Sequence, residues 1–287
     1  MRILFAIAHY YNPQGGGRYG SLGPNSQGRI NALSSSIISL HQLFNRQYML
    51  DIARRQTIPA NQLNEYAIDV IISTTGNSHL LSNLPISANI YSHNATSAEP
   101  MMLGFECQAI LKNNLGKYDY YCYLEDDLIL HDPHIFTKLG WFNNNVGNSC
   151  LLQPNRYETS PEGPVYKSYI DGDINPRATA GFQNVNEQPE ISGSIMGKPV
   201  LFKRALNPHS GCYFLNAEQM DIWSKESHFQ DRDTGFIGPL ESAATLGVMR
   251  TFKVYKPAPV NANFFEIQHY GRSFLSQIGK QIAFIDQ

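Results

Sequence analysis

Three consecutive acidic residues, Glu125, Asp126 and Asp127, are the part of this sequence best suited to chemistry. They follow the run Tyr-Tyr-Cys-Tyr-Leu and precede Leu-Ile-Leu, so we expect them at the end of a buried strand. Side chains alternate along a strand, which puts Glu125 and Asp127 on one face and Asp126 on the other. Crowded carboxylates repel one another, and Mg²⁺ or Mn²⁺ relieves that repulsion. The segment therefore predicts a divalent-metal site; a solvated acidic turn is the alternative.

A second group of acids lies later in the chain. Pro239 suits the first turn of a helix, which places Glu241 near the helix N-terminus. The helix dipole favours an ionised carboxylate there. An ordinary first-turn carboxylate gives the same pattern, and Asp231 and Asp233 lie just upstream as alternative acids.

The elements that must position these acids alternate in type along the chain. Apolar and β-branched runs predict buried strands, and apolar residues at helical spacing predict the helices between them. We expect strands at residues 3–10, 48–52, 67–74, 118–124, 212–215 and 252–255, and helices at 29–44, 101–111, 132–142, 217–223 and 239–249. This alternation predicts an α/β fold with a mostly parallel sheet and helices on both faces, in a single domain spanning residues 1–287.

The strand, the acidic triplet and the helix start that follows resemble the DxD region of nucleotide-sugar-dependent glycosyltransferases of the GT-A fold, with Glu125 in place of the first Asp. The resemblance implies a GT-A-like, Rossmann-like fold, a UDP- or GDP-sugar donor and a hydroxyl acceptor on a glycan or another molecule. It also implies that Glu125, Asp126 and Asp127 contact the donor through Mn²⁺ or Mg²⁺. Asp127 is the best-matched ligand of that cation, with Glu125 beside it.

Two downstream segments extend the resemblance. Phe236-Ile237-Gly238-Pro239-Leu240-Glu241-Ser242 lies where such enzymes carry an xED-like segment, which implies that Glu241 deprotonates the acceptor hydroxyl, with Asp233 as runner-up. His269 stands where the family often supplies a late histidine, which implies a further metal ligand; a structural histidine is the alternative. The predicted activity is a metal-dependent, inverting glycosyl transfer.

Residues 155–199 break the alternation of elements. Gly, Pro, Ser, Asn and Glu dominate there, which predicts a long irregular insertion. A lid that shields the donor from water is one interpretation, with aromatic residues stacking on sugar faces; a surface loop is the other. Asp171-Gly172-Asp173 lacks the later glycine and glutamate of a calcium loop, so we expect a polar turn.

A glycine-rich loop spans residues 14–28. Gly15 to Gly20 fits G-x-G-x-x-G, but Ser-Leu-Gly-Pro-Asn follows where a dinucleotide site needs a helix, so we expect no such site. Arg18 and Arg29 are candidates for contacts with the donor diphosphate or the acceptor. They are the only cations in residues 14–29, which disfavours the alternative of a sugar nucleotidyltransferase.

Composition limits the remaining possibilities. A net charge of −2 excludes a generally basic nucleic-acid binder. The four cysteines contain no C-x-x-C pair, which argues against a zinc knuckle or a disulfide framework. The sequence has no run of roughly 20 apolar residues that would predict a transmembrane segment. We expect a cytoplasmic protein, with peripheral membrane contact left open.

A non-catalytic carbohydrate- or nucleotide-binding protein on the same scaffold is the rival from another class.

Overall fold

The computed structural model describes residues 1–16, 20–64 and 66–285, which form two compact units. Unit 1 comprises Met1–Asp126 and Phe214–Arg232, and unit 2 comprises Asp127–Tyr213 and Asp233–Gln287. Each unit thus combines two separate stretches of the chain. The first boundary falls between the two aspartates of the acidic triplet. The expected single domain stays a prediction.

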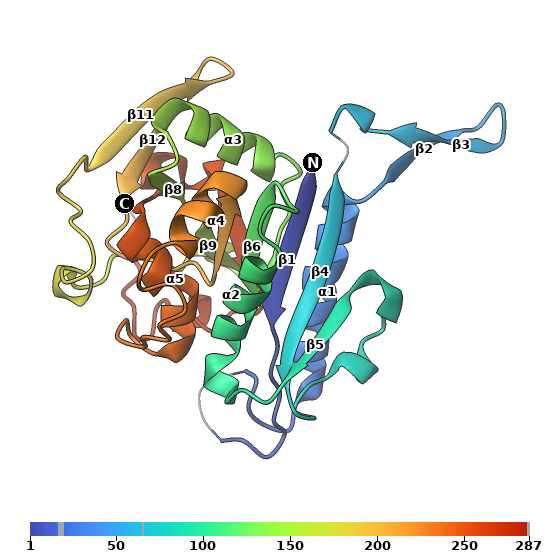
Figure 1. Ribbon diagram of the computed structural model, residues 1–287, viewed down its shortest axis with the longest axis horizontal. Helices are drawn as coiled ribbons and strands as arrows, with labels where there is room; N and C mark the ends of the chain where they lie inside the picture. Colours follow the sequence, from blue (N-terminus) through green and yellow to red (C-terminus); the bar gives the residue numbers. More distant parts are fainter. Residues whose placement is uncertain (17–19, 65, 286–287) are drawn as a thin grey trace. The chain divides into compact units, whose positions relative to one another are not determined.

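Unit 1 is built on a five-stranded sheet in the order β13-β6-β1-β4-β5 (Figure 1). β1 (Arg2–Ala8) pairs in parallel with β4 (Ala67–Thr75) on one side and with β6 (Tyr120–Glu125) on the other. β4 pairs in parallel with β5 (Ser92–Thr96), and β13 (Cys212–Asn216) lies beside β6. Residues 3–7 of β1 are completely buried, as a central strand covered on both faces requires.

Helices cover both faces of this sheet. On one face, Phe44 of α1 (Ser26–Phe44) stacks on Phe5 of β1, with ring centroids 6.1 Å apart. On the other, the Cys107 thiol of α2 (Leu103–Asn113) is hydrogen-bonded to Ser73, which pairs in register with Ala8. Phe5 and Ala8 point to opposite faces because they are three residues apart on one strand. The predicted α/β fold with a mostly parallel sheet is confirmed. α4 (Ala217–Ser224) also belongs to this unit.

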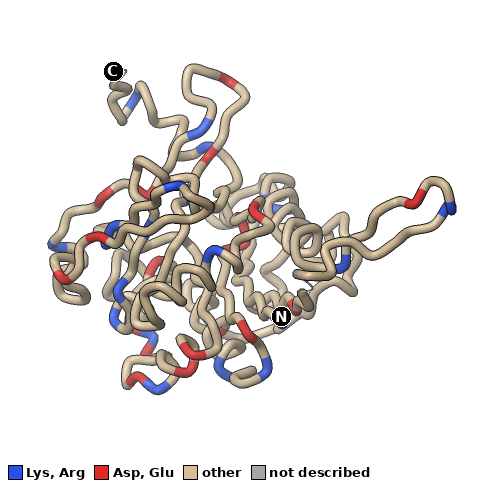
Figure 2. Tube along the Cα trace, turned by 90° about the horizontal axis from the view of Figure 1, so that it is seen from above, with Lys and Arg blue, Asp and Glu red and all other residues tan. Residues whose placement is uncertain are grey.

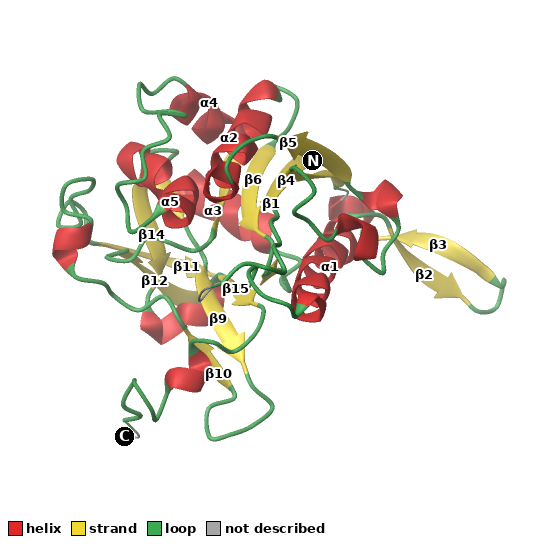
Figure 3. Ribbon diagram, turned by 90° about the horizontal axis from the view of Figure 1, so that it is seen from below, coloured by secondary structure: helices red, strands yellow, loops and turns green. Residues whose placement is uncertain are grey.

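Unit 2 contains two four-stranded sheets, in the orders β10-β9-β15-β7 and β11-β12-β14-β8 (Figure 3). Their strands are β7 (Leu128–Ile129), β8 (Cys150–Leu152), β9 (Asn155–Thr159), β10 (Lys167–Tyr169), β11 (Glu190–Ile195), β12 (Lys198–Arg204), β14 (Lys253–Pro257) and β15 (Glu266–His269). The helices of this unit are α3 (Ile135–Val146) and α5 (Pro239–Thr251). Short 3₁₀ helices in the two units are Gln62–Asn64, Leu81–Asn83, Ala88–Ile90, Pro100–Met102, Pro176–Ala178, Pro259–Phe264 and Leu275–Gln277.

The prediction of an irregular insertion at residues 155–199 is confirmed only in part. Residues 170–189 contain no strand, but β9, β10, β11 and the start of β12 occupy the parts of the stretch on either side of them. β11 alternates between exposed and half-buried residues, so its ladder needs no apolar run and leaves no apolar signal in the sequence.

The strand expected at residues 48–52 forms, but not in the main sheet. Within the described part of the chain, β2 (Gln47–Asp51) pairs only with β3 (Gln56–Ala60), in antiparallel register, as a separate two-stranded ribbon. Tyr48, Met49 and Leu50 of β2 are exposed, so this apolar run is not part of the core.

Two further expectations concern membranes and thiols. Within the described residues, no helix has the length and apolar character needed to cross a bilayer. Cys107, Cys122, Cys150 and Cys212 are all buried, and within the described residues no disulfide joins any two of them.

Candidate functional site

Strand pairing in unit 2 brings Asp127 and His269 together. Asp127 directly precedes β7, and β7 pairs antiparallel with β15 so that Leu128 lies opposite His269. The backbone N–H of Tyr270 donates to the carbonyl of Asp127 over 2.8 Å. As a result, Nε2 of His269 lies 3.6 Å from Oδ2 of Asp127, with both side chains largely buried. Two residues that the resemblance implies as metal ligands are therefore neighbours.

Glu158 supports His269 from the other side of the ring. β9 runs parallel to β15, and Oε1 of Glu158 lies 2.9 Å from Nδ1 of His269. The Glu158 side chain is fully buried, and its Oε2 accepts the backbone N–H groups of Phe274 and Leu275 at 3.0 and 2.7 Å. Burial acts to raise the pKa of Glu158, but these hydrogen bonds, that from His269 first, hold it below its usual range. Glu158 is therefore a fixed carboxylate acceptor.

The two carboxylates beside His269 give its ring an environment that suits metal binding. Burial acts to lower the pKa of His269, but the hydrogen bond to Glu158 and the charge of Asp127 outweigh it and raise the pKa. With the proton on Nδ1 facing Glu158, the lone pair of a neutral ring is on Nε2, toward Asp127. A carboxylate and an imidazole backed by a buried carboxylate form a donor set that fits Mn²⁺ better than Mg²⁺. Among the described residues, no group of three His, Cys, Asp or Glu side chains forms a cation cage, so substrate oxygens and water would have to supply the other ligands.

Asp126 lies in unit 1, where protein groups engage both of its oxygens, and its predicted contact with the donor stays a prediction. Nδ1 of His9 lies 2.5 Å from Oδ2, and the Arg29 guanidinium donates to Oδ1. Nε2 of His9 accepts the backbone N–H of Leu80 over 3.0 Å, so the ring proton is on Nδ1. Burial, and then the charge of Arg29, lower the pKa of His9 to about 3, which keeps the ring neutral. Asp126 therefore anchors β1 and α1 to the end of β6.

The remaining members of the predicted donor site stay predictions. Glu125 is the last residue of β6, lies opposite Ala8 of β1 and is half-buried. Arg29 lies in the first turns of α1 with its side chain mostly buried against Asp126. Arg18 lies outside the described residues.

The two candidate bases differ in their surroundings. α5 begins at Pro239, as predicted, which places the half-buried Glu241 in its first turn. Asp233 is engaged by the backbone N–H of Gly235 at 2.8 Å and by the Arg250 guanidinium. The Gly235 bond and then the Arg250 bond lower the pKa of Asp233, which makes it a weaker proton acceptor than an aspartate without these bonds.

A buried charge cluster in unit 2 contradicts the expected polar turn at Asp171. The Asp171 carboxylate lies 2.8 Å from Nη2 of Arg156 and 3.0 Å from Nζ of Lys256, and its side chain is 1% exposed. Burial works in the opposite direction, but Lys256 and Arg156 hold the pKa of Asp171 well below its usual range. No local signal in the sequence reveals this cluster, because its members are far apart along the chain.

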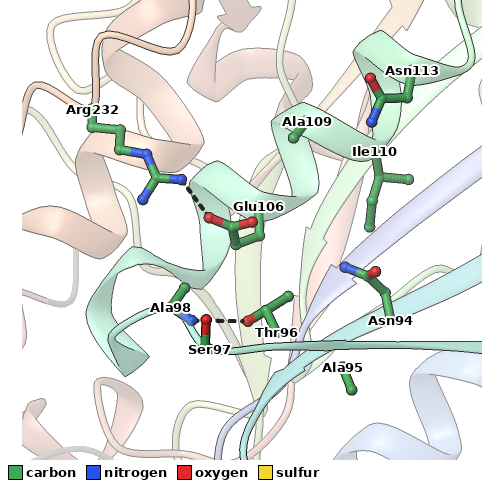
Figure 4. Close-up of a pocket in the computed structure, with 10 residues that line it drawn as sticks. All are labelled: Asn94, Ala95, Thr96, Ser97, Ala98, Glu106, Ala109, Ile110, Asn113 and Arg232. Carbon is green, nitrogen blue, oxygen red and sulfur yellow. Dashed lines mark hydrogen bonds and ion pairs between the residues drawn. The ribbon is translucent and has the colours of Figure 1, made fainter.

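A polar hollow of about 560 Å³ lies in unit 1, between β5 and α2. Asn94 and Thr96 line it from the strand, and Glu106 and Asn113 from the helix, while Arg232 forms an ion pair with Glu106 at its side (Figure 4). None of the predicted site residues that the structure describes lines it.

The α/β fold with a mostly parallel central sheet is the one that the resemblance to GT-A glycosyltransferases implies. No family model and no curated protein matches the sequence. Among solved structures, the chain is similar to the apo crystal structure of mouse xyloside xylosyltransferase 1, with 11% sequence identity and a TM-score of 0.41. The match covers 88% of this chain and 82% of that chain.

Proposed function

We propose that this protein is a metal-dependent glycosyltransferase that moves a sugar from a nucleotide-sugar donor to an acceptor hydroxyl. The observation that carries the proposal is the arrangement of Asp127, His269 and Glu158 in unit 2. The buried Glu158 carboxylate fixes the ring of His269 so that Nε2 faces Asp127. Carboxylates that accept the other ring N–H of a metal-binding histidine orient the ring in this way.

Asp127 and His269 would hold the cation, with Mn²⁺ favoured by the imidazole. When bound, the cation neutralises the charge that develops on the departing nucleoside diphosphate. Asp127 contributes the negative charge of the site and His269 a neutral ligand, so their combined charge leaves a divalent ion able to attract phosphate oxygens.

Other residues have supporting roles in the proposal. Neutral His9 and the Arg29 guanidinium both contact the Asp126 carboxylate. These contacts fix the chain where β6 ends and Asp127 follows. Glu241 would accept the proton of the acceptor hydroxyl, because Asp233 is engaged by Arg250 and Gly235. Direct displacement with a single base of this kind inverts the anomeric centre.

The test is to incubate the purified chain with a panel of UDP- and GDP-sugars and follow nucleoside diphosphate release with Mn²⁺, with Mg²⁺ and after chelation. We expect release that needs the cation and is lost in Asp127→Asn. Asp221→Asn, at an exposed carboxylate of α4, is the matched control and retains it. Cation-dependent binding of a nucleoside diphosphate by the wild type without any release would favour the non-catalytic binding protein. An active Asp127→Asn variant would remove the metal assignment.

A further inference from the structure

The ribbon formed by β2 and β3 exposes a group of large apolar side chains. Tyr48, Met49 and Leu50 are 58, 61 and 68% exposed, and Ile52 in the turn is 77% exposed. The ribbon projects from the sheet of unit 1 (Figure 1). Two strands alone bury little apolar area, so these side chains add little to folding stability. Contiguous exposed apolar residues of this kind mark an interaction surface.

The register of the ribbon gives its two faces different character. Tyr48 and Leu50 share one face with Pro59, which lies opposite Tyr48. Met49 and Ile58 lie opposite each other on the second face, where Ile58 is only 37% exposed. The first face is therefore the more open one, and Ile52 follows it in the turn. Tyrosine beside leucine and isoleucine is a composition suited to the interface between water and lipid.

Arginines flank the apolar face at both ends of the ribbon. Arg46 precedes β2, while Arg54 and Arg55 occupy the turn, and all three are exposed. The acid of this segment is Asp51, whose Oδ2 lies 3.8 Å from Nε of Arg54. Figure 2 shows charged residues at the tip and an uncharged stretch behind them. The ribbon thus combines exposed apolar side chains with a surplus of positive charge.

We propose that the β2–β3 ribbon binds an anionic phospholipid surface, with Tyr48, Leu50 and Ile52 at the level of the lipid headgroups and the three arginines against lipid phosphates. Apolar burial and attraction to anionic lipid reinforce each other in such contacts. A second copy of the ribbon fits less well as the partner, because it would bring the same surplus of arginine against these arginines. The proposal is independent of the proposed enzymatic activity.

The test is flotation of the intact chain with vesicles of phosphatidylcholine alone and with vesicles of phosphatidylcholine and phosphatidylglycerol in equal amounts. We expect binding to the anionic vesicles that weakens in high salt, because salt screens the attraction between the arginines and the lipid phosphates. Tyr48→Ser with Leu50→Ser is expected to lower the partition coefficient about tenfold or more, since two apolar side chains no longer leave water. Arg54→Gln with Arg55→Gln is expected to lower it about tenfold on anionic vesicles only.

Met196→Ser is the matched control, because Met196 is a 97% exposed apolar residue in the turn between β11 and β12. It should bind vesicles as the wild type does. All variants should keep the wild-type unfolding midpoint, since the altered side chains are exposed. Equal binding by the wild type and the Tyr48→Ser, Leu50→Ser variant would overturn the proposal. The proposal would also be overturned if the wild type did not bind vesicles but formed a dimer, and if this double variant were monomeric. That result would assign the ribbon to contact with a second copy of the chain.

Discussion

The carboxylate of Glu158 lies 2.9 Å from Nδ1 of His269 and leaves Nε2 of the same ring facing Asp127. One buried side chain thus sets the tautomer and the direction of a candidate metal ligand. Three strands that are far apart in the sequence contribute to this arrangement, because β15 lies between β9 and β7. A change at Glu158 should therefore alter the proposed metal site although Glu158 is not one of its proposed ligands.

Glu158→Gln tests that relationship. The amide still fills the space, but its NH₂ group replaces an oxygen among N–H donors, so we expect a stability loss of about 1–3 kcal/mol. We expect Mn²⁺ affinity, measured by isothermal titration calorimetry, to fall about 10- to 100-fold. Glu162→Gln, at an exposed residue of the same segment, is the control and should change neither quantity. Unchanged Mn²⁺ affinity in a folded Glu158→Gln protein would separate Glu158 from the metal site.

The two candidate bases can be distinguished by their variants. We expect Glu241→Gln to lower kcat by about 10²- to 10⁴-fold with little change in Mn²⁺ affinity, because a general base is lost and a metal ligand is not. Asp233→Asn should lower the unfolding midpoint through the lost Arg250 partner while kcat stays near the wild-type value. Single-turnover kinetics and thermal unfolding on the same preparations measure both effects. The reverse pattern would make Asp233 the base.

Asp171→Asn tests the buried charge cluster. Removing one carboxylate leaves Arg156 and Lys256 buried beside each other without their shared counter-charge, so we expect a loss of about 3–5 kcal/mol in the free energy of unfolding. Urea titration measures it. Asp173→Asn, at an exposed residue two positions away, is the control and should leave the urea midpoint unchanged. A loss as small as that of the control would show that the cluster does not stabilise unit 2.

The buried His9 predicts a pH dependence of stability. Its pKa is lowered from about 6.5 in the unfolded chain to about 3 in the folded protein, so between these values the unfolded state binds one proton more. The contribution of His9 is fully present above pH 6.5 and is lost as the pH falls toward 3, by up to about 1.4 kcal/mol per pH unit. Urea midpoints of the wild type and His9→Gln at pH 7.5 and pH 5 should therefore converge at the lower pH. A constant difference between the two proteins would contradict a neutral His9.

The sequence allowed the core of unit 1 to be predicted because its signals are local. The run from Ile3 to Ile7 is apolar at every position, as a strand buried on both faces requires, and α1 shows helical spacing. The start of α5 at Pro239 was also predictable, since proline suits the first turn of a helix. Each of these features is decided by neighbouring residues.

The candidate site was predictable only in part. Asp127 and His269 were named separately from their order in the chain, but the β7–β15 register that joins them has no local signal. Glu158 was missed because it lies in a polar stretch that suggests a loop. The sequence predicts a turn at Asp171, because the burial of this residue depends on Arg156 and Lys256, which only the tertiary structure brings to it. The β2–β3 ribbon shows the opposite error, since its apolar run predicts a buried strand but its side chains are exposed.

The position of β15 inside its sheet has a consequence for biosynthesis. β7 and β9 leave the ribosome long before β15, yet both pair with β15. Their facing edges must wait unpaired while more than a hundred further residues are translated, and such edges attract other chains. Asp127 acquires its histidine neighbour only after residue 269 has emerged. The proposed metal site is therefore expected to be incomplete in the growing polypeptide, and the interval between the synthesis of β9 and that of β15 is the stage most exposed to aggregation.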